Sequence, residues 1–220
     1  MPGTEFDRLA RKSAAMLELQ DEMNRRVDED WIRRDRAWYR AIWIECAELM
    51  DHYGGWKWWK HSGPTDVGQV LLEIVDIWHF GLSARIRPDQ SFAETGRQIA
   101  AEWLAPVPSR GFLIDVEAMA AAAVAERRFA VPVVPILLEQ IGLDFDDLYR
   151  SYVGKNVLNV FRQDRGYRSG EYRKQWSGRE DNVHLAEIVD VLDADDPDYR
   201  GRLYGELERR YRLDENPGAG

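Results

Sequence analysis

The strongest constraint in this sequence is a set of four carboxylates, arranged as two pairs within apolar, helix-like segments. Glu45 and Glu48 lie in WIECAELMDH, and Glu73 and Asp76 lie in LEIVDIWHF. Carboxylates three residues apart occupy one face of an α-helix, and here that face also carries the apolar residues expected in a core. Buried carboxylates are costly unless they are protonated, paired with a base or bound to a metal. The two pairs therefore predict helices that meet around a divalent cation.

The spacing of apolar side chains predicts a chain built mostly from helices, and no alternating run is long enough to indicate a major sheet. A short loop, WKWWKHSGPTD, joins the second and third helices, which makes them antiparallel neighbours and brings the two carboxylate pairs opposite each other. Helices are predicted near residues 9–27, 31–52, 67–84, 91–104, 114–128, 144–164, 182–193 and 195–212, with an apolar segment at 132–141.

Local signals mark several ends of these helices. Gly54 and Gly55 are expected to end the second helix, and Thr65 or Asp66 to cap the third. A turn is predicted from Pro106 to Gly111. Four tryptophans lie at helix-core spacing, namely Trp31, Trp38, Trp43 and Trp78.

Length and composition favour one folded domain. The chain has 220 residues, of which 45% are hydrophobic and 31% charged, so it can bury a sizeable core and is far from a disordered composition. We expect a single all-α domain over residues 1–220, with a less well assigned helical region near 89–140.

Several classes of function are excluded. Cys46 is the only cysteine, so one chain forms no disulfide and no cysteine-based metal site. The amino-terminal segment lacks the apolar centre of a signal peptide, and no run approaches the roughly 20 apolar residues of a membrane span. A net charge of −9 argues against nucleic-acid binding over the whole surface. We expect a soluble cytoplasmic protein that binds neither membranes nor nucleic acid.

The sequence also lacks the common nucleotide and nucleophile motifs. It contains neither a GxxxxGK[ST] loop nor GxGxxG, so P-loop and Rossmann binding are not indicated. His52, His61 and His184 have no mutual spacing typical of a metal site, and no serine or cysteine lies beside a plausible histidine and acid. Covalent catalysis is therefore not expected.

Further motifs follow the two acidic pairs. The ExxE and ExxD patterns are preceded by LELQDEMN (17–24), and followed by KNVLNVFRQDRGY (155–167) and EYRKQWSGREDN (171–182). In this combination the chain resembles the dimeric all-α dUTPases of the all-α NTP pyrophosphatase superfamily. The resemblance covers most of the chain and implies an antiparallel helical bundle of the all-α NTP pyrophosphatase type, acting as a homodimer whose active site borrows residues from the second subunit.

The resemblance implies a dUTP diphosphatase that uses Mg²⁺ to cleave dUTP, and also dUDP, at the α-phosphate, giving dUMP. It places the metal ligands at Glu45, Glu48, Glu73 and Asp76. Oxygen ligands of this kind suit Mg²⁺, which activates water and neutralises charge on a leaving pyrophosphate. The catalytic candidates are Glu48, which would take the proton of the attacking water, and Glu45.

Phosphate binding is expected on the helix near residues 144–164. Lys155, Asn159 and Arg162 follow at spacings of four and three residues and so share one helical face. Arginine offers phosphate oxygens a planar fork and lysine a mobile charge. The family motif adds three phosphate-binding candidates from the following segment, namely Tyr167, Lys174 and Asn182.

The base and sugar site is expected from more distant residues. By resemblance, Gln20 and Asn24 lie one helical turn apart and offer amide groups to the uracil edge. Trp56 or Trp59 would stack on the base, and His79 would lie near the sugar.

Alternatives remain open for each of these assignments. The acids can be surface groups paired with nearby arginines, the basic row can be a solvated helix face, and the aromatic residues and His79 can belong to the core. At the level of function, the alternatives are a pyrophosphatase for another pyrimidine nucleotide such as dCTP, or a nucleotide-fold protein that acts mainly through a regulatory partner.

Overall fold

The computed structural model describes residues 4–61, 63–105, 107–193, 196 and 198–215. The predicted all-α class is confirmed, because regular structure in this part of the chain is helical apart from one two-stranded hairpin. Contacts divide the chain into two compact units, residues 1–149 and 150–220, and the expectation of a single domain stays a prediction. None of the described helices is long and apolar enough to cross a membrane.

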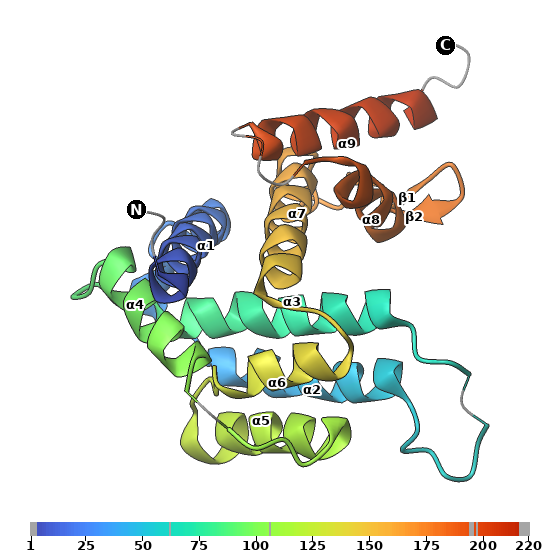
Figure 1. Cartoon of the computed structure of the whole chain (residues 1–220). Helices are drawn as coiled ribbons and strands as arrows, with labels where there is room; N and C mark the ends of the chain where they lie inside the picture. Colours follow the sequence, from blue (N-terminus) through green and yellow to red (C-terminus); the bar gives the residue numbers. More distant parts are fainter. Residues whose placement is uncertain (1–3, 62, 106, 194–195, 197, 216–220) are drawn as a thin grey trace. The chain divides into compact units, whose positions relative to one another are not determined.

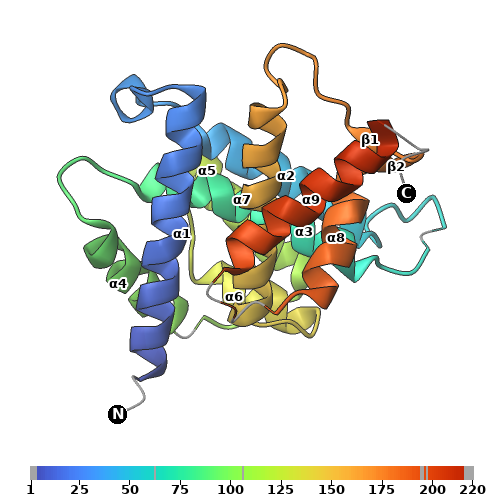
Figure 2. The same cartoon turned by 90° about the horizontal axis from the view of Figure 1, so that it is seen from above.

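The first unit is a group of helices packed around α2 and α3 (Figure 1). Helix α2 packs along α3 and against α5, while α1 lies alongside α4 in both views (Figures 1 and 2). Its elements are α1 (Glu5–Val27), the 3-10 helix η1 (Trp31–Arg34), α2 (Trp38–Tyr53), α3 (Val67–Arg85), α4 (Phe92–Trp103), α5 (Phe112–Glu126), α6 (Val133–Gln140) and the start of α7 (Phe145–Asp164).

The predicted helix over residues 31–52 is wrong in its first third. After η1, Asp35 adopts a left-handed conformation with φ of 43°, and α2 begins only at Trp38. The carboxylate of Asp28 accepts a hydrogen bond from Arg36 Nη2 at 2.7 Å and lies 3.3 Å from Arg34 Nε. These contacts stabilise a turn that separates η1 from α2, so the two do not form one continuous helix.

Other helix ends follow the sequence signals. Gly54 ends α2, and both Gly54 and Gly55 have positive φ, of 78° and 81°. Asp66 rather than Thr65 caps α3, because its side chain accepts a hydrogen bond from the amide of Gln69 at 3.2 Å. The predicted turn at 106–111 and the last predicted helix each begin at a residue, 106 and 195, that lies outside the described part of the chain.

Trp78 of α3 belongs to the core of the first unit. Trp78 is fully buried, and its ring meets the edges of Trp103 and Phe129 at centroid distances of 5.7 and 5.5 Å. Trp31 is also buried, as predicted. Trp43 is 40% exposed, so its assignment to the core is wrong: its neighbour, Ile42, takes the inward position on α2.

The second unit combines the rest of α7 with a hairpin and two further helices, of which α8 lies beside α9 (Figure 2). Its remaining elements are β1 (Gln175–Trp176), β2 (Arg179–Glu180), α8 (Asp181–Val191) and α9 (Tyr199–Glu215). Ser177 and Gly178 join the strands with φ of 49° and 76°, as a type I′ turn requires. Sequence reasoning missed this hairpin because two-residue strands leave no alternating pattern.

Candidate functional site

Helices α2 and α3 run side by side in opposite directions, joined by the loop at residues 54–66 (Figure 1). One carboxylate oxygen from each of Glu45, Glu73 and Asp76 lies within 4.8 Å of the other two. Glu73 is buried, and Glu45 and Asp76 are half-buried. Three oxygen donors converging from two helices match the ligands that a hard divalent cation prefers.

Glu48, the fourth predicted ligand, is exposed and lies outside this group of three carboxylates. Its charge nevertheless acts on Glu45. Burial, together with repulsion from Asp76, Glu48 and Glu73 and a hydrogen bond with Glu73, raises the pKa of the Glu45 carboxyl to about 8. At neutral pH this carboxyl therefore holds a proton, which a divalent cation would displace on binding.

A histidine that sequence reasoning set aside lies next to the carboxylates. His52 Nε2 is 3.4 Å from Glu73 Oε1. His52 follows Glu48 by four residues and Glu45 by seven, so helical spacing alone placed it on the same side of α2. The search for pairs of histidines overlooked it, because its partner here is a carboxylate on the neighbouring helix.

The residues predicted to read the base meet between α1 and α3. Gln20 Oε1 lies 2.7 Å from His79 Nδ1, and Gln20 Nε2 donates a hydrogen bond to Asn24 Oδ1 at 3.0 Å. Asn24 Nδ2 donates to Ser83 Oγ at 3.0 Å, a residue that the sequence did not single out. His79 follows Asp76 by one helical turn, so α3 carries side chains of both the carboxylate group and this amide network.

The aromatic candidates lie on the loop between α2 and α3. Trp56 and Trp59 pack edge to face with ring centroids 5.6 Å apart and are 38% and 61% exposed. Lys57 lies over the ring of Trp56 at 4.8 Å and pairs with Asp51. Trp56, but not Trp59, lines a cavity of about 270 Å³ that also includes His52. The roles of Trp56 and Trp59 in ligand binding stay predictions.

The second unit brings part of the predicted phosphate site together. Arg162 binds Asp181 with two hydrogen bonds of 2.8 and 2.9 Å, and its Nη1 donates to Asn159 Oδ1 at 3.1 Å. Asp181 is fully buried and also accepts a hydrogen bond from the hydroxyl of Tyr172 at 2.8 Å. The guanidinium of Arg162 also lies 5.9 Å from the ring of Tyr167. Arg162 is thus held in a fixed orientation by a buried carboxylate, which argues against a freely solvated basic face.

The other phosphate candidates differ in their surroundings. Lys155 is buried, with 7% of its surface exposed, whereas Lys174 is exposed. The backbone carbonyl of Lys174 accepts a hydrogen bond from the amide of Asp181 at 2.9 Å, which places Asn182 close by at the start of α8. The Oδ1 atom of Asn182 is buried and has no hydrogen-bond partner among the residues that the structure describes.

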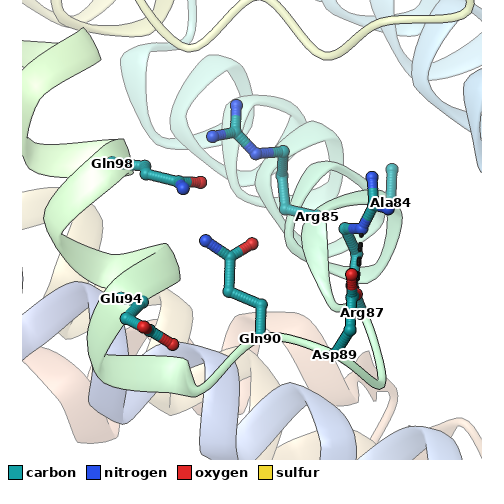
Figure 3. A pocket seen from close by; sticks show the side chains of 7 residues that line it. All are labelled: Ala84, Arg85, Arg87, Asp89, Gln90, Glu94 and Gln98. Atoms are coloured by element: carbon teal, nitrogen blue, oxygen red, sulfur yellow. Dashed lines mark hydrogen bonds and ion pairs between the residues drawn. The ribbon is translucent and has the colours of Figure 1, made fainter.

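A larger cavity, of about 610 Å³, lies at the end of α3 beside α4 and contains none of the predicted site residues. Figure 3 shows the amides of Gln90 and Gln98 directed into it, opposite Arg85. Arg85 makes two hydrogen bonds to Glu102, of 3.0 and 2.6 Å, and Arg87 pairs with Asp89. Because its arginines already have carboxylate partners, this cavity is a weaker candidate than the carboxylate group between α2 and α3.

A family model described as dUTPase matches residues 12–167. This segment includes the carboxylates of α2 and α3, the amide network of α1 and α3, and the row from Lys155 to Arg162, but it ends before Lys174 and Asn182. No curated protein matches the chain.

Proposed function

The chain belongs to the dUTPase family and is a dUTP diphosphatase, and from this premise we propose that it cleaves dUTP at the α-phosphate, with Mg²⁺, to give dUMP and pyrophosphate. The observation that carries the proposal is the convergence of Glu45, Glu73 and Asp76 within 4.8 Å. Such a group offers a cation several oxygen ligands, and Mg²⁺ prefers carboxylate oxygens together with water and phosphate.

The four carboxylates of this site are assigned to metal binding and to proton transfer. Glu45, Glu73 and Asp76 hold the metal, and His52 orients Glu73 through their 3.4 Å contact. The metal supplies activation of water and neutralises charge on the leaving pyrophosphate. Glu48 is exposed, so it is accessible to an attacking water, and we assign it the removal of a proton from that water. We also assign Glu48 a share in metal binding. Glu45 is the second catalytic candidate.

The remaining contacts are assigned by chemistry and family motif. Gln20 and Asn24 bind the uracil edge, His79 lies near the sugar, and Trp56 or Trp59 stacks on the base. The phosphate chain is assigned to Lys155, Asn159, Arg162, Tyr167, Lys174 and Asn182. Since the metal and the α-phosphate do not require a γ-phosphate, we further propose that dUDP is a substrate. The protein is proposed to act as a cytoplasmic homodimer.

The proposal is tested by measuring initial rates with dUTP, dUDP, dCTP, dTTP and dATP, with and without Mg²⁺. We expect dUTP and dUDP to be turned over only when Mg²⁺ is present, and the other nucleotides to be poor substrates. Equal turnover of dTTP would contradict the uracil assignment. Full activity in the presence of a chelator would contradict the metal assignment.

A substitution in the carboxylate group tests whether this group holds the metal. Replacing Glu73→Gln keeps the shape of the side chain but removes one ligand charge, and we expect kcat to fall by more than about 100-fold. Glu117→Gln, on the exposed side of α5, is the matched control and should leave the rate unchanged. Similar rates for the two variants would show that the carboxylate group does not hold the metal.

A further inference from the structure

Four side chains between α1 and α3 form a closed ring of hydrogen bonds. Ser83 Oγ donates to the backbone carbonyl of His79 at 3.0 Å, and Asn24 Nδ2 donates to Ser83 Oγ at 3.0 Å. Gln20 Nε2 donates to Asn24 Oδ1 at 3.0 Å, and Gln20 Oε1 lies 2.7 Å from His79 Nδ1, which closes the ring. The ring thus starts and ends at His79.

The direction of every bond in the ring follows from the carbonyl of His79. A carbonyl only accepts, so the single hydroxyl hydrogen of Ser83 must point to it. Ser83 Oγ can then only accept from Asn24, so Asn24 must present its nitrogen to Ser83 and its oxygen to Gln20. Gln20 in turn presents its nitrogen to Asn24 and its oxygen to His79, which must carry its proton on Nδ1. Reversing one amide alone would place two donors or two acceptors face to face, and reversing both would cost the hydrogen bond from Ser83 to the carbonyl of His79.

Burial makes such a reversal costly. Ser83 is 2% exposed, Gln20 5% and His79 6%, so water does not replace a lost partner. A buried polar group without a partner is strongly disfavoured, and bonds in a chain reinforce one another. Asn24 is only half-buried, so it belongs to the ring and still has an accessible side. The ring therefore holds the amide of Asn24 in one arrangement of nitrogen and oxygen.

A fixed amide distinguishes uracil from cytosine. Uracil carries an N3–H donor beside the O4 acceptor, whereas cytosine carries an N3 acceptor beside the N4 amino donor. An asparagine side chain matches either edge, but only with its nitrogen and oxygen exchanged. An amide that can rotate accepts both bases, and one that is held in place accepts one of them.

We propose that Ser83 is a positioning residue that fixes the orientation of the Asn24 amide and thereby sets the preference for uracil over cytosine. This inference rests on the proposed function, in which Asn24 contacts the base. Ser83 itself need not touch the substrate, because it acts through Asn24, Gln20 and His79.

The test compares Ser83→Ala with the wild type in two measurements. The first is the ratio of kcat/KM for dUTP to that for dCTP, which we expect to fall by about tenfold or more, because the amide can then rotate to match cytosine. The second is the tautomer of His79 in the protein without nucleotide, read from ¹⁵N–¹H correlation spectra. Wild type should show the proton on Nδ1, and the variant should show a substantial Nε2–H population.

Two control variants distinguish this positioning role from a nonspecific effect of the substitution on folding. Ser13→Ala removes another buried hydroxyl on α1, one that has no hydrogen-bond partner among the described residues, and it should change neither measurement. Ser83→Thr keeps the hydroxyl and should retain the selectivity and the tautomer of the wild type. This rescue also covers the case in which Ser83→Ala folds poorly.

A third variant distinguishes failure of this inference from failure of the proposed function. Asn24→Asp replaces the donor with an acceptor, so it should reduce the preference for dUTP over dCTP if this side chain contacts the base. If it does so while Ser83→Ala leaves both the ratio and the tautomer unchanged, the role of Ser83 is overturned and the base site stands. If Asn24→Asp leaves selectivity unchanged, the base assignment is wrong, and the selectivity role of Ser83 is overturned with it.

Discussion

At the scale of single residues, the chemistry of the first unit depends on crowding among its carboxylates. Glu45 is half-buried, and its pKa is raised to about 8, chiefly by burial and then by the charges of Asp76, Glu48 and Glu73. In the unfolded chain the same carboxyl titrates near its ordinary value of 4.5. The folded protein thus binds one proton more than the unfolded chain over the interval between these two values.

This difference gives a pH-dependent stability of the metal-free protein. Because the folded state holds the extra proton, its stability is greatest below about pH 4.5 as far as Glu45 is concerned, and it falls as pH rises toward about 8. Glu45→Gln removes the titration, so we expect its melting temperature in a chelator to exceed that of the wild type at pH 8.5, with a smaller difference at pH 6. Parallel pH profiles for the two proteins would contradict the raised pKa.

In the second unit a buried ion pair fixes a residue of the proposed phosphate site. Asp181→Ala leaves the guanidinium of Arg162 and the hydroxyl of Tyr172 without their shared acceptor. We expect a loss of about 3–5 kcal/mol in the free energy of unfolding, measured with urea. Arg209→Ala breaks only an exposed pair with Glu206 on α9 and should cost less than about 1 kcal/mol. Equal losses would show that the pair contributes little beyond a surface contact.

Sequence reasoning identified residues better than it identified their surroundings. Glu45, Glu73 and Asp76 were recognisable because acids at helical spacing are conspicuous within apolar segments. Serine at position 83 gave no such signal, since its role depends on Asn24, which lies 59 residues away in sequence. Contacts of that kind require the packing of α1 on α3, which the pattern of either helix alone does not contain.

At the scale of secondary-structure elements, periodicity and capping signals were sufficient to predict most helices. They failed at residues 31–37, where Asp28 draws two arginines into a turn that helix propensity does not reveal. These sequence signals also did not predict how closely α1 and α4 approach each other. A Cβ atom added at Gly96 would lie 2.7 Å from the backbone oxygen of Ala10 and 2.9 Å from the backbone nitrogen of Ala14.

The close approach of α4 to α1 predicts a strong effect of a small substitution. Gly96→Ala should destabilise the protein by about 1–3 kcal/mol, because the neighbouring atoms belong to a helix backbone that must shift as a whole. Gly205→Ala, in α9, meets no atom within 4 Å and should be neutral or stabilising by up to about 1 kcal/mol. Urea denaturation of both variants measures the difference. A neutral Gly96→Ala would show that α1 and α4 separate readily.

At the scale of the whole molecule, the family match extends across the boundary between the two compact units. The matched segment ends at residue 167, whereas the first unit ends at residue 149. The matched segment therefore includes the helices that carry the carboxylates and also the whole of α7. The hairpin and α8 to α9 lie beyond it, so the proposals for Lys174 and Asn182 depend on the motif resemblance alone.

Exposed apolar side chains of the first unit predict the association state. Two packed helices carry large apolar residues that are substantially exposed: Trp43 and Ile44 on α2, at 40% and 43%, and Ile114 and Val124 on α5, at 45% and 58%. Large exposed apolar side chains favour burial against a partner. Together with the resemblance to dimeric enzymes, this leads us to expect a homodimer that buries this side of α2.

Substitution at this apolar surface should change the association state. Light scattering after size exclusion should give a mass near twice the 25.6 kDa of one chain for the wild type. Trp43→Glu should shift the mass toward 25.6 kDa, because a charge in an apolar interface stays unpaired and desolvated. Val191→Glu alters a side chain that is 77% exposed in the second unit and should leave the dimer intact. A dimer that persists in Trp43→Glu would place the interface elsewhere, and a monomeric wild type would rule out the expected homodimer.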